Sequence, residues 1–216
     1  SVEIPKNFMD DEKHGIVKQN VQDMARRARL SQDDYALDRW ALGFTTVLTN
    51  DGIAWFSNSH TTIDGTTVDN IETGVLTAAS LETLIVRLGR QVNQGGILGH
   101  FDANLLLVPL NLLKEASEII DSELLAGTGN NNVNYLSRKY PGLELKFSPE
   151  LDVTSTTAHF LASSEHSCKR WIREEVATNY IPWDISKNKV GVYQSWFREV
   201  VAPISYEGAV GSDGSV

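Results

Sequence analysis

The stretch "IVKQNVQDMARRARLSQDDYALDRWAL", residues 16–42, has the pattern of one long amphipathic helix. Its apolar residues recur at spacings of three, four and seven, which places them on one stripe: Val17, Val21, Met24, Ala28, Tyr35 and Leu42. The opposite face is polar and includes three arginines, Arg26, Arg27 and Arg29. About 27 residues rising 1.5 Å each would form a rod of roughly 40 Å. This is long for a helix of a compact enzyme domain.

Two further helices and a buried strand are predicted downstream. Residues 43–75 are rich in glycine, threonine and Asp-Gly or Asn-Asp pairs, which indicates a loop with short strands. Thr77 is a helix cap, and the helix after it has an apolar face made of Ala78, Leu81, Leu84, Ile85 and Leu88. "ANLLLVP", residues 103–109, is typical of a strand buried on both faces. A third helix is expected from Pro109 to residue 125, followed by a flexible connection over 126–134.

The second half of the chain is predicted to be mostly β-structure. Alternation at Leu143, Leu145 and Phe147 predicts one strand, and residues 156–163 predict another. Residues 169–184 are amphipathic or strand-like, and residues 189–210 predict a long strand that bends at Pro203. Helices and strands are therefore segregated along the chain, so the predicted class is α+β.

Composition narrows the possible functions. The chain has 216 residues, 41% of them hydrophobic, with a formal net charge of −9. This charge argues against tight binding to a phosphate backbone. A single cysteine, Cys168, excludes a disulfide within the chain and favours a cytosolic site of assembly. No apolar run approaches the roughly 20 residues that a membrane-spanning helix needs, so no membrane partner is expected.

"DGIAWFSNSH", residues 51–60, raises the possibility of a hydrolase that uses Ser57 or Ser59 with His60. A serine hydrolase needs a strained turn that presents the nucleophile, and no G-x-S-x-G motif occurs. Ser59 and His60 are adjacent, and adjacent side chains of an extended segment point in opposite directions. We therefore expect Trp55 and Phe56 to pin a polar loop, in which Ser57 to His60 act as capping and contact residues.

Metal and phosphate chemistry are not expected either. The five histidines form no H-x-x-x-H or H-E-x-x-H pattern. The glycines of residues 93–100 follow a helix and precede no lysine, so they indicate a helix stop and a turn. Cys168 alone is most simply a buried small residue. No cofactor, metal or catalytic residue is predicted, and the protein is expected not to be an enzyme.

Several motifs, taken in order, resemble tailed-phage and prophage major capsid proteins. "NFMDDEKHGIV" before the long helix resembles the entry to the spine helix of those proteins, and "DGIAWFSNSH" resembles the loop that follows it. Further similar segments are "LTAASLETLIVRLGRQVNQGG", "LLLVPLNLLKEASEII", "SPELDVTSTTAHFLAS" and "WFREVVAPISYEGAVGSDG". The similarity covers nearly the whole chain in collinear order, and the order and spacing carry it more than any single motif.

The resemblance implies the Hong Kong 97-type capsid fold. Residues 1–74 and 186–216 would form the peripheral domain, with the spine helix at about 16–42 and the long C-terminal strand, and residues 75–185 would form the axial domain. The N-terminal arm and most of the extended loop of the family would precede Ser1. The family's crosslinking lysine lies in that loop, so crosslinking chemistry is assigned to no residue of this chain.

The resemblance also implies a structural role. The chain would assemble with itself as hexamers and pentamers into an icosahedral head around double-stranded DNA, with scaffold, portal and decoration proteins as further partners. It would assemble in the host cytoplasm and reside in the virion, and it would contact the packaged DNA non-specifically. By analogy, the expected subunit contacts are made by Arg26, Arg27, Arg29, Trp55, Phe56 and His60. An encapsulin-type protein compartment, which shares the fold, is the alternative.

Overall fold

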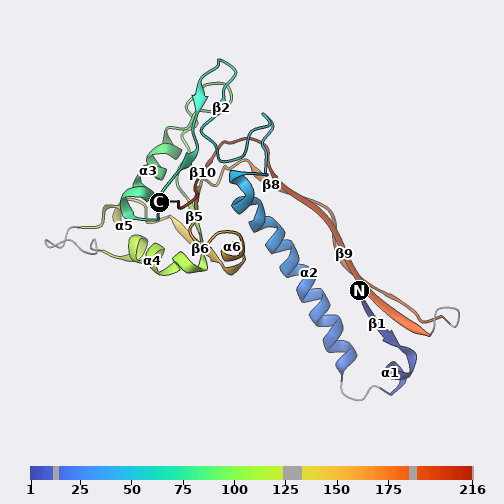
Figure 1. The fold of residues 1–216 in the computed structure, drawn as a ribbon. Helices are drawn as coiled ribbons and strands as arrows, with labels where there is room; N and C mark the ends of the chain where they lie inside the picture. The colour runs from blue at the N-terminus through green and yellow to red at the C-terminus, as the bar shows by residue number, and fades with distance from the viewer. Residues whose placement is uncertain (12–14, 124–132, 185–188, 216) are drawn as a thin grey trace. The chain divides into compact units, whose positions relative to one another are not determined.

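The structure, a computed structural model, describes residues 1–11, 15–123, 133–184 and 189–215 (Figure 1). The chain divides into two compact units. Ser1–Ala36 and Arg170–Val201 form the first, which we call the helix–ribbon unit. Leu37–Lys169 and Ala202–Val216 form the second, the five-stranded unit. These bounds differ from those of the peripheral and axial domains, whose assignment stays a prediction.

A mixed sheet organises the five-stranded unit. Its strands, in spatial order, are β4 (Ile71–Glu72), β10 (Ala209–Ser212), β7 (His159–Ala162), β5 (Leu105–Pro109) and β6 (Glu144–Ser148). The outer pairs β10–β4 and β5–β6 are parallel, and β7 is antiparallel to both of its neighbours. Strand β5 is buried along nearly its whole length, as its continuous apolar run predicts.

Helices supply an aliphatic core on one face of this sheet. They are α3 (Ala78–Gly89), α4 (Leu113–Asp121), which follows the 3₁₀ turn η2 (Leu110–Leu112), and α5 (Tyr135–Lys139); a further short helix, α6 (Pro149–Thr154), follows β6 and is not part of this core. Helix α3 begins at Thr77, whose side chain accepts from Ser80 N–H in a capping box. One cluster joins α3, α4 and α5 to the sheet; its strand members are Leu106, Val108, Leu161 and Val210.

A second core, made of aromatic rings, lies on the opposite face of the same sheet. It contacts Phe160 of β7 and Gly211 of β10, which are the chain neighbours of Leu161 and Val210. Phe160 directly precedes Leu161 on β7, so its side chain points to the opposite face of the sheet from that of Leu161. It packs against Trp40, Phe44 and Phe56, with ring centroids 5.3–5.8 Å apart. Gly211 lies opposite Phe160 in the β10–β7 pairing, and a Cβ there would come within 3.0 Å of the Phe56 ring. The absent side chain at Gly211 therefore makes room for the aromatic rings.

Residues 42–75, which follow the long helix, contain only short elements. A 3₁₀ turn, η1 (Leu42–Phe44), follows the long helix, and β2 (His60–Thr61) pairs antiparallel with β3 (Thr67–Val68). This confirms the predicted loop with short strands over residues 43–75.

The helix–ribbon unit contains the long helix and two long strands. Its elements are β1 (Val2–Pro5), α1 (Lys6–Asp10), α2 (Ile16–Ala41), β8 (Cys168–Ile181) and β9 (Val190–Pro203), of which α2, β8 and β9 extend a few residues into the other unit. The strand order is β1-β9-β8, with β1 antiparallel to β9. Strands β8 and β9 run side by side as a long ribbon (Figure 1). Nearly every residue of β8 is exposed.

A buried polar contact fastens α2 to this ribbon. The side chain of Glu199 is only 1% exposed, and one of its oxygens accepts from Gln32 Nε2 at 2.9 Å. The same oxygen accepts from Arg170 Nε at 2.9 Å and Nη2 at 2.6 Å. Gln32 is itself buried. It lies on the apolar face of α2, where residues such as Met24 and Ala28 are only half-buried. Charge-assisted hydrogen bonds replace the apolar contacts that a more enclosed helix would make.

Most predicted elements are confirmed, with local corrections. The long helix ends at Ala41, and the second helix, the buried strand and the β-rich second half are found where expected. Pro109 ends β5 and is also the N-cap of the 3₁₀ turn η2, which runs directly into α4, so the third helical segment starts after Pro109 as a 3₁₀ turn. Phe147 does not share the burial of Leu143, because β6 is an edge strand of the sheet and leaves Phe147 half-exposed. The predicted connection at 126–134 lies mostly outside the described residues.

Candidate functional site

His60 is fully enclosed, and both of its ring nitrogens face hydrogen-bond acceptors. Nδ1 lies 2.7 Å from an Asp51 carboxylate oxygen, and Nε2 lies 3.1 Å from the Trp55 carbonyl oxygen. The ring of Tyr206 packs on His60 with centroids 4.8 Å apart. Neither nitrogen is left to take a proton from a nucleophile.

Asp51 is the centre of a local hydrogen-bond cluster. Burial opposes its charged form, but hydrogen bonds from His60, from the Thr49 hydroxyl and from the Ile53 backbone N–H outweigh that effect. The pKa of Asp51 therefore lies below its ordinary value. Burial raises the pKa of Tyr206 to about 12, so this phenol stays neutral beside the pair. His60 is enclosed within the cluster, and Asp51, whose side chain is 22% exposed, is held by hydrogen bonds from within the loop.

The two serines take part in loop geometry. The Ser57 Oγ accepts from Ser59 N–H at 3.2 Å, and the Ser59 hydroxyl donates to Asn58 at 2.7 Å. Among the hydrogen bonds of the described residues, none joins either serine to His60. The arrangement does not support a hydrolase, and it agrees with the capping role expected for these residues.

Two buried amides, Asn70 and Gln91, hold this loop to the C-terminal segment. Asn70 accepts from Ser57 N–H at 2.8 Å and donates to the carbonyls of Trp55 and Ala209 at 2.8 and 3.3 Å. Gln91 accepts from Gly208 N–H at 2.8 Å and donates to the Tyr206 carbonyl at 3.1 Å. Sequence reasoning missed both, because their partners lie more than 100 residues away or across the loop, and single polar residues carry no periodic signal.

Trp55, Phe56 and His60 are each at most 1% exposed. Trp55 stacks on Phe56 with centroids 4.6 Å apart and packs on Trp40 at 4.5 Å. Trp55 and Phe56 thus attach the loop to the aromatic core through contacts that include Trp40; that this core belongs to the peripheral domain stays a prediction. A role of the three residues in a subunit contact stays a prediction, and it can only be indirect, because their side chains are enclosed within one chain.

Arg26, Arg27 and Arg29, in contrast, are exposed on α2. Arg29 lies 3.8 Å from Asp33 one helical turn away, in an ion pair that solvent reaches. Arg27 lines a shallow hollow together with Asp23 and Asn20. The three arginines are available to a neighbour, and their contact role stays a prediction.

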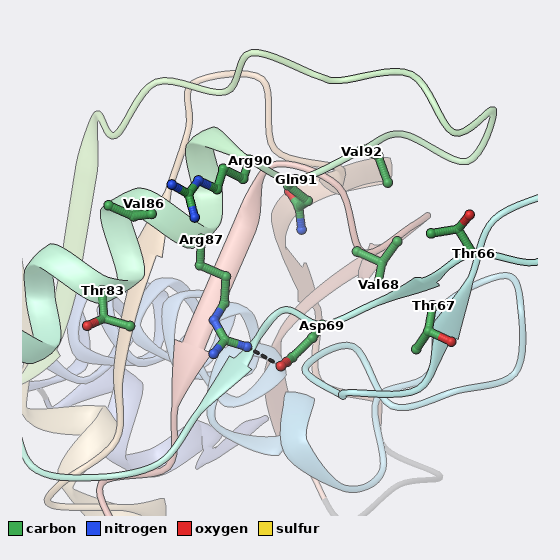
Figure 2. A pocket seen from close by; sticks show the side chains of 10 residues that line it. All are labelled: Thr66, Thr67, Val68, Asp69, Thr83, Val86, Arg87, Arg90, Gln91 and Val92. Carbon is green, nitrogen blue, oxygen red and sulfur yellow. Dashed lines mark ion pairs between the residues drawn. The ribbon is translucent and has the colours of Figure 1, made fainter.

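A hollow of about 470 Å³ lies between α3 and the β3–β4 segment (Figure 2). Arg87 crosses it and forms ion pairs with Asp69 and with Glu72, the latter at 2.6 Å. Figure 2 shows Thr83, Val86 and Arg90 on the helical side and Thr66 to Asp69 opposite. Because Arg87 is already neutralised and no nucleophile faces a base, the hollow offers no catalytic arrangement.

The remaining titratable groups are in structural positions. Burial raises the pKa of Cys168 to about 11, which suppresses its thiolate. Burial also lowers the pKa of His159 and of His166. Within the described ranges no group of three or more His, Cys, Asp or Glu residues is placed to hold a metal ion. Across the same ranges no helix has both the length and the apolarity to cross a membrane.

Comparison with known sequences identifies a family in the first third of the chain. Residues 1–75 match the family described as "Mu-like prophage major head subunit gpT". None of the curated proteins matches the sequence significantly. The match covers β1, α2 and the His60 loop, so the resemblance to major head subunits is confirmed for residues 1–75.

Comparison with solved structures identifies the fold. The capsid of bacteriophage JBD30 is similar with a TM-score of 0.58 and 15% identity, over 69% of this chain and 73% of that one. The capsid of Myoviridae phage XM1 is similar with a TM-score of 0.56 and 14% identity, over 99% of this chain and 71% of that one. The SrpI encapsulin of Synechococcus elongatus PCC 7942 reaches 0.50 with 9% identity, over 99% and 71%.

These findings define the class. The protein has the α+β, Hong Kong 97-type fold of phage capsids, as the sequence resemblance implied. More particularly, its N-terminal third, residues 1–75, is similar in sequence to the major head subunit family of Mu-like prophages.

Proposed function

We propose that this protein is the major capsid subunit of a tailed phage or prophage, and that it self-assembles into an icosahedral head that encloses double-stranded DNA. The observation that carries the proposal is the coincidence of two results on one chain: the major head subunit match over residues 1–75 and the capsid fold over the chain. In this proposal, residues 1–74 and 186–216 form the peripheral domain and residues 75–185 the axial domain.

The physical character of the chain supports a shell role. Buried polar groups such as His60 and Asn70 are engaged in internal hydrogen bonds, and the hollow at Arg87 presents no reactive arrangement. The helix–ribbon unit leaves large apolar side chains exposed, among them Trp171, Ile172 and Trp196. Exposed apolar area of this kind is typical of surfaces that another molecule covers. We place the assembled protein in the virion, assembled in the host cytoplasm, with scaffold, portal and decoration proteins as further partners.

Electron microscopy of the intact protein tests the proposal. We expect closed shells, or hexamers and pentamers as assembly intermediates, in a concentration-dependent equilibrium with monomers. A protein that stays monomeric across concentration, salt and added scaffold protein would contradict it.

The second candidate is an encapsulin-type compartment, which the fold similarity to the SrpI encapsulin favours. The content of purified shells separates the two. A phage head contains DNA that is protected from nuclease, whereas a compartment contains protein cargo and no genome. We expect protected DNA in shells recovered from phage-producing cells.

A further inference from the structure

His159 is a fully enclosed histidine with a single hydrogen-bond partner. It belongs to β7, and its side chain lies on the same face of the sheet as that of Leu161, the face of the aliphatic core. Its Nδ1 lies 3.2 Å from the Thr157 carbonyl oxygen. A carbonyl oxygen only accepts, so Nδ1 carries the proton of the neutral ring. Nε2 is buried, and no donor among the described residues reaches it.

The surroundings of His159 oppose a second proton on the ring. A protonated Nε2 would be a buried, positively charged donor without an acceptor, which is costly. Burial accordingly lowers the pKa of His159. His60 is equally enclosed but differs, because both of its ring nitrogens face acceptors. Of these two histidines, His159 is therefore the one whose site accommodates only the neutral ring.

The charged groups around His159 compensate little for its burial. Asp213, which follows β10, favours the charged ring, but its effect is smaller than that of burial. Helix α3 packs on β7 and carries Glu82, which is exposed, and Arg87, which is already paired with carboxylates that include Glu72 of β4. Strand β5, on the other side of β7, has no charged residue. Protonation of the ring would thus favour its exit to solvent.

The same stretch of chain holds the segment that follows β10. Ser212 pairs with His159 in the β10–β7 ladder. The Thr157 hydroxyl donates to the Asp213 carbonyl at 3.3 Å, while the carbonyl of Thr157 faces His159. Gly214 packs directly on Thr157 with a φ of +69°, and a Cβ there would collide with it. Loss of the ring therefore removes a support of Thr157, on which the segment rests.

We propose that His159 is an acid-operated latch: below about pH 6, protonation drives its ring out of the interior and loosens residues 212–215 from Thr157 and β7. The inference concerns a single chain, so it does not depend on the proposed self-assembly. With the ring outside, the histidine has its ordinary pKa of 6.5, whereas the enclosed ring has a lower one. The closed state is thus fully favoured above that value and loses stability as the pH falls from 6.5 toward the pKa of the enclosed ring.

Hydrogen exchange followed by mass spectrometry tests the latch on the unmodified, unassembled protein. After correction for the intrinsic pH dependence of exchange, a peptide covering residues 209–215 should exchange about three to ten times faster at pH 5.5 than at pH 7.5. One pH unit below the ordinary histidine pKa of 6.5 allows no more than about tenfold. A peptide from α3 is the internal reference and should change little. Equal corrected rates at the two pH values would overturn the inference.

The variant His159→Asn separates the charge from the hydrogen bond. An asparagine amide still donates to the Thr157 carbonyl but takes up no proton, so exchange over 209–215 should no longer depend on pH, whatever its absolute rate. The matched control is His100→Asn, at an exposed histidine whose φ of +52° asparagine tolerates; it should retain the pH response. A pH response that persists in His159→Asn would assign it to another group and overturn the inference.

Nuclear magnetic resonance of the unmodified protein decides if His159→Asn does not fold. The His159 ring should titrate below 6.5, and the amide signals of residues 212–215 should shift with the same midpoint. A His159 ring that titrates at or above 6.5, or amide signals that do not follow it, would contradict the latch.

Discussion

The two compact units differ in how they are stabilised. The five-stranded unit has an aliphatic core on one face of its sheet and a cluster of tryptophan and phenylalanine rings around Phe160. The helix–ribbon unit instead has a three-stranded sheet whose edge strand β8 is almost wholly exposed, with Glu199 and Arg170 fastening a helix to it. The five-stranded unit is therefore stabilised mainly by buried apolar side chains and the helix–ribbon unit more by a buried polar contact, although both expose some large apolar side chains, such as Ile63 in the first and Trp171 in the second. The following predictions test that contrast, and each is measured on unassembled protein unless stated.

The largest effect is expected from Phe56→Ala, because Phe56 is fully buried between Trp55, Phe44 and Phe160. Removing a buried ring leaves a cavity and should cost about 3–5 kcal/mol of unfolding free energy. Denaturant titration measures it. The control is Phe8→Ala in the helix–ribbon unit, where the side chain is half-exposed and the loss should stay below about 1 kcal/mol. Equal losses would contradict the contrast between the units.

Arg170→Ala should cause the largest loss within the helix–ribbon unit. It leaves the enclosed Glu199 carboxylate without its cation, at a cost of about 3 kcal/mol, the lower end for a broken buried pair because solvent reaches part of Arg170. Thermal unfolding followed by circular dichroism measures it. The double variant Arg170→Met/Glu199→Met removes both charges and should recover most of the loss; no recovery would show that the pair is not what fastens α2.

Gly211→Ala should destabilise the aromatic core by overpacking. A Cβ at Gly211 would lie 3.0–3.1 Å from atoms of Phe56 and Phe44, so the rings must shift, at a cost of about 2 kcal/mol. Gly142→Ala is the matched control, because a Cβ there meets nothing within 4 Å. A stability of Gly211→Ala equal to that of Gly142→Ala would mean that the rings are not tightly packed.

Asp51→Asn should cost on the order of 1 kcal/mol near pH 6, the net value of a side-chain hydrogen bond. The pKa of Asp51 is lower in the folded protein than its ordinary value of 3.8, so its ionised form stabilises the fold above that pH. This contribution is lost as the pH falls through the folded-state pKa. The stability difference between the unmodified protein and Asp51→Asn should therefore shrink between pH 5 and pH 2, as measured by urea unfolding at each pH. A difference independent of pH would exclude the charged hydrogen bonds as its cause.

The smallest effect on stability is expected for the triple variant Arg26→Ala/Arg27→Ala/Arg29→Ala. These side chains are exposed and the Arg29–Asp33 pair is solvated, so stability should change by no more than about 0.5 kcal/mol. If the three arginines contact neighbouring subunits, the yield of shells should fall although folding is unchanged. Normal assembly would remove them from the interface.

Local sequence signals predicted the elements well where periodicity was strong. The stripe from Val17 to Leu42 predicted α2, the Thr77 cap and the face at Leu81 and Leu84 predicted α3, and the apolar run at Leu106 predicted a buried strand. Short helices were missed, although Asn134 and the Ser148–Pro149 pair are capping signals. Five or six residues give no readable period, so only the cap could have revealed them.

The polar loop shows what local sequence could not decide. Sequence spacing excluded a nucleophile–base pair at Ser59 and His60, and the structure agrees, because His60 binds Asp51 and the Trp55 carbonyl. The sequence resemblance predicted that His60 contacts a neighbouring subunit, whereas its ring is wholly enclosed within this chain. Enclosure depends on Tyr206, and on Asn70 and Gln91 that tie the loop to the C-terminal segment.

The amino-acid sequence by itself determined the α+β class, the long helix, the order of the strands along the chain and the resemblance to phage major head subunits. These follow from periodicity, capping and motif order, which are properties of neighbouring residues. Only the tertiary structure decided which polar residues are enclosed. Gln32 and Glu199 are 167 residues apart, and Asp213 reaches Thr157 only because β10 pairs with β7. Burial and charge compensation depend on such distant pairings, which local sequence patterns do not encode.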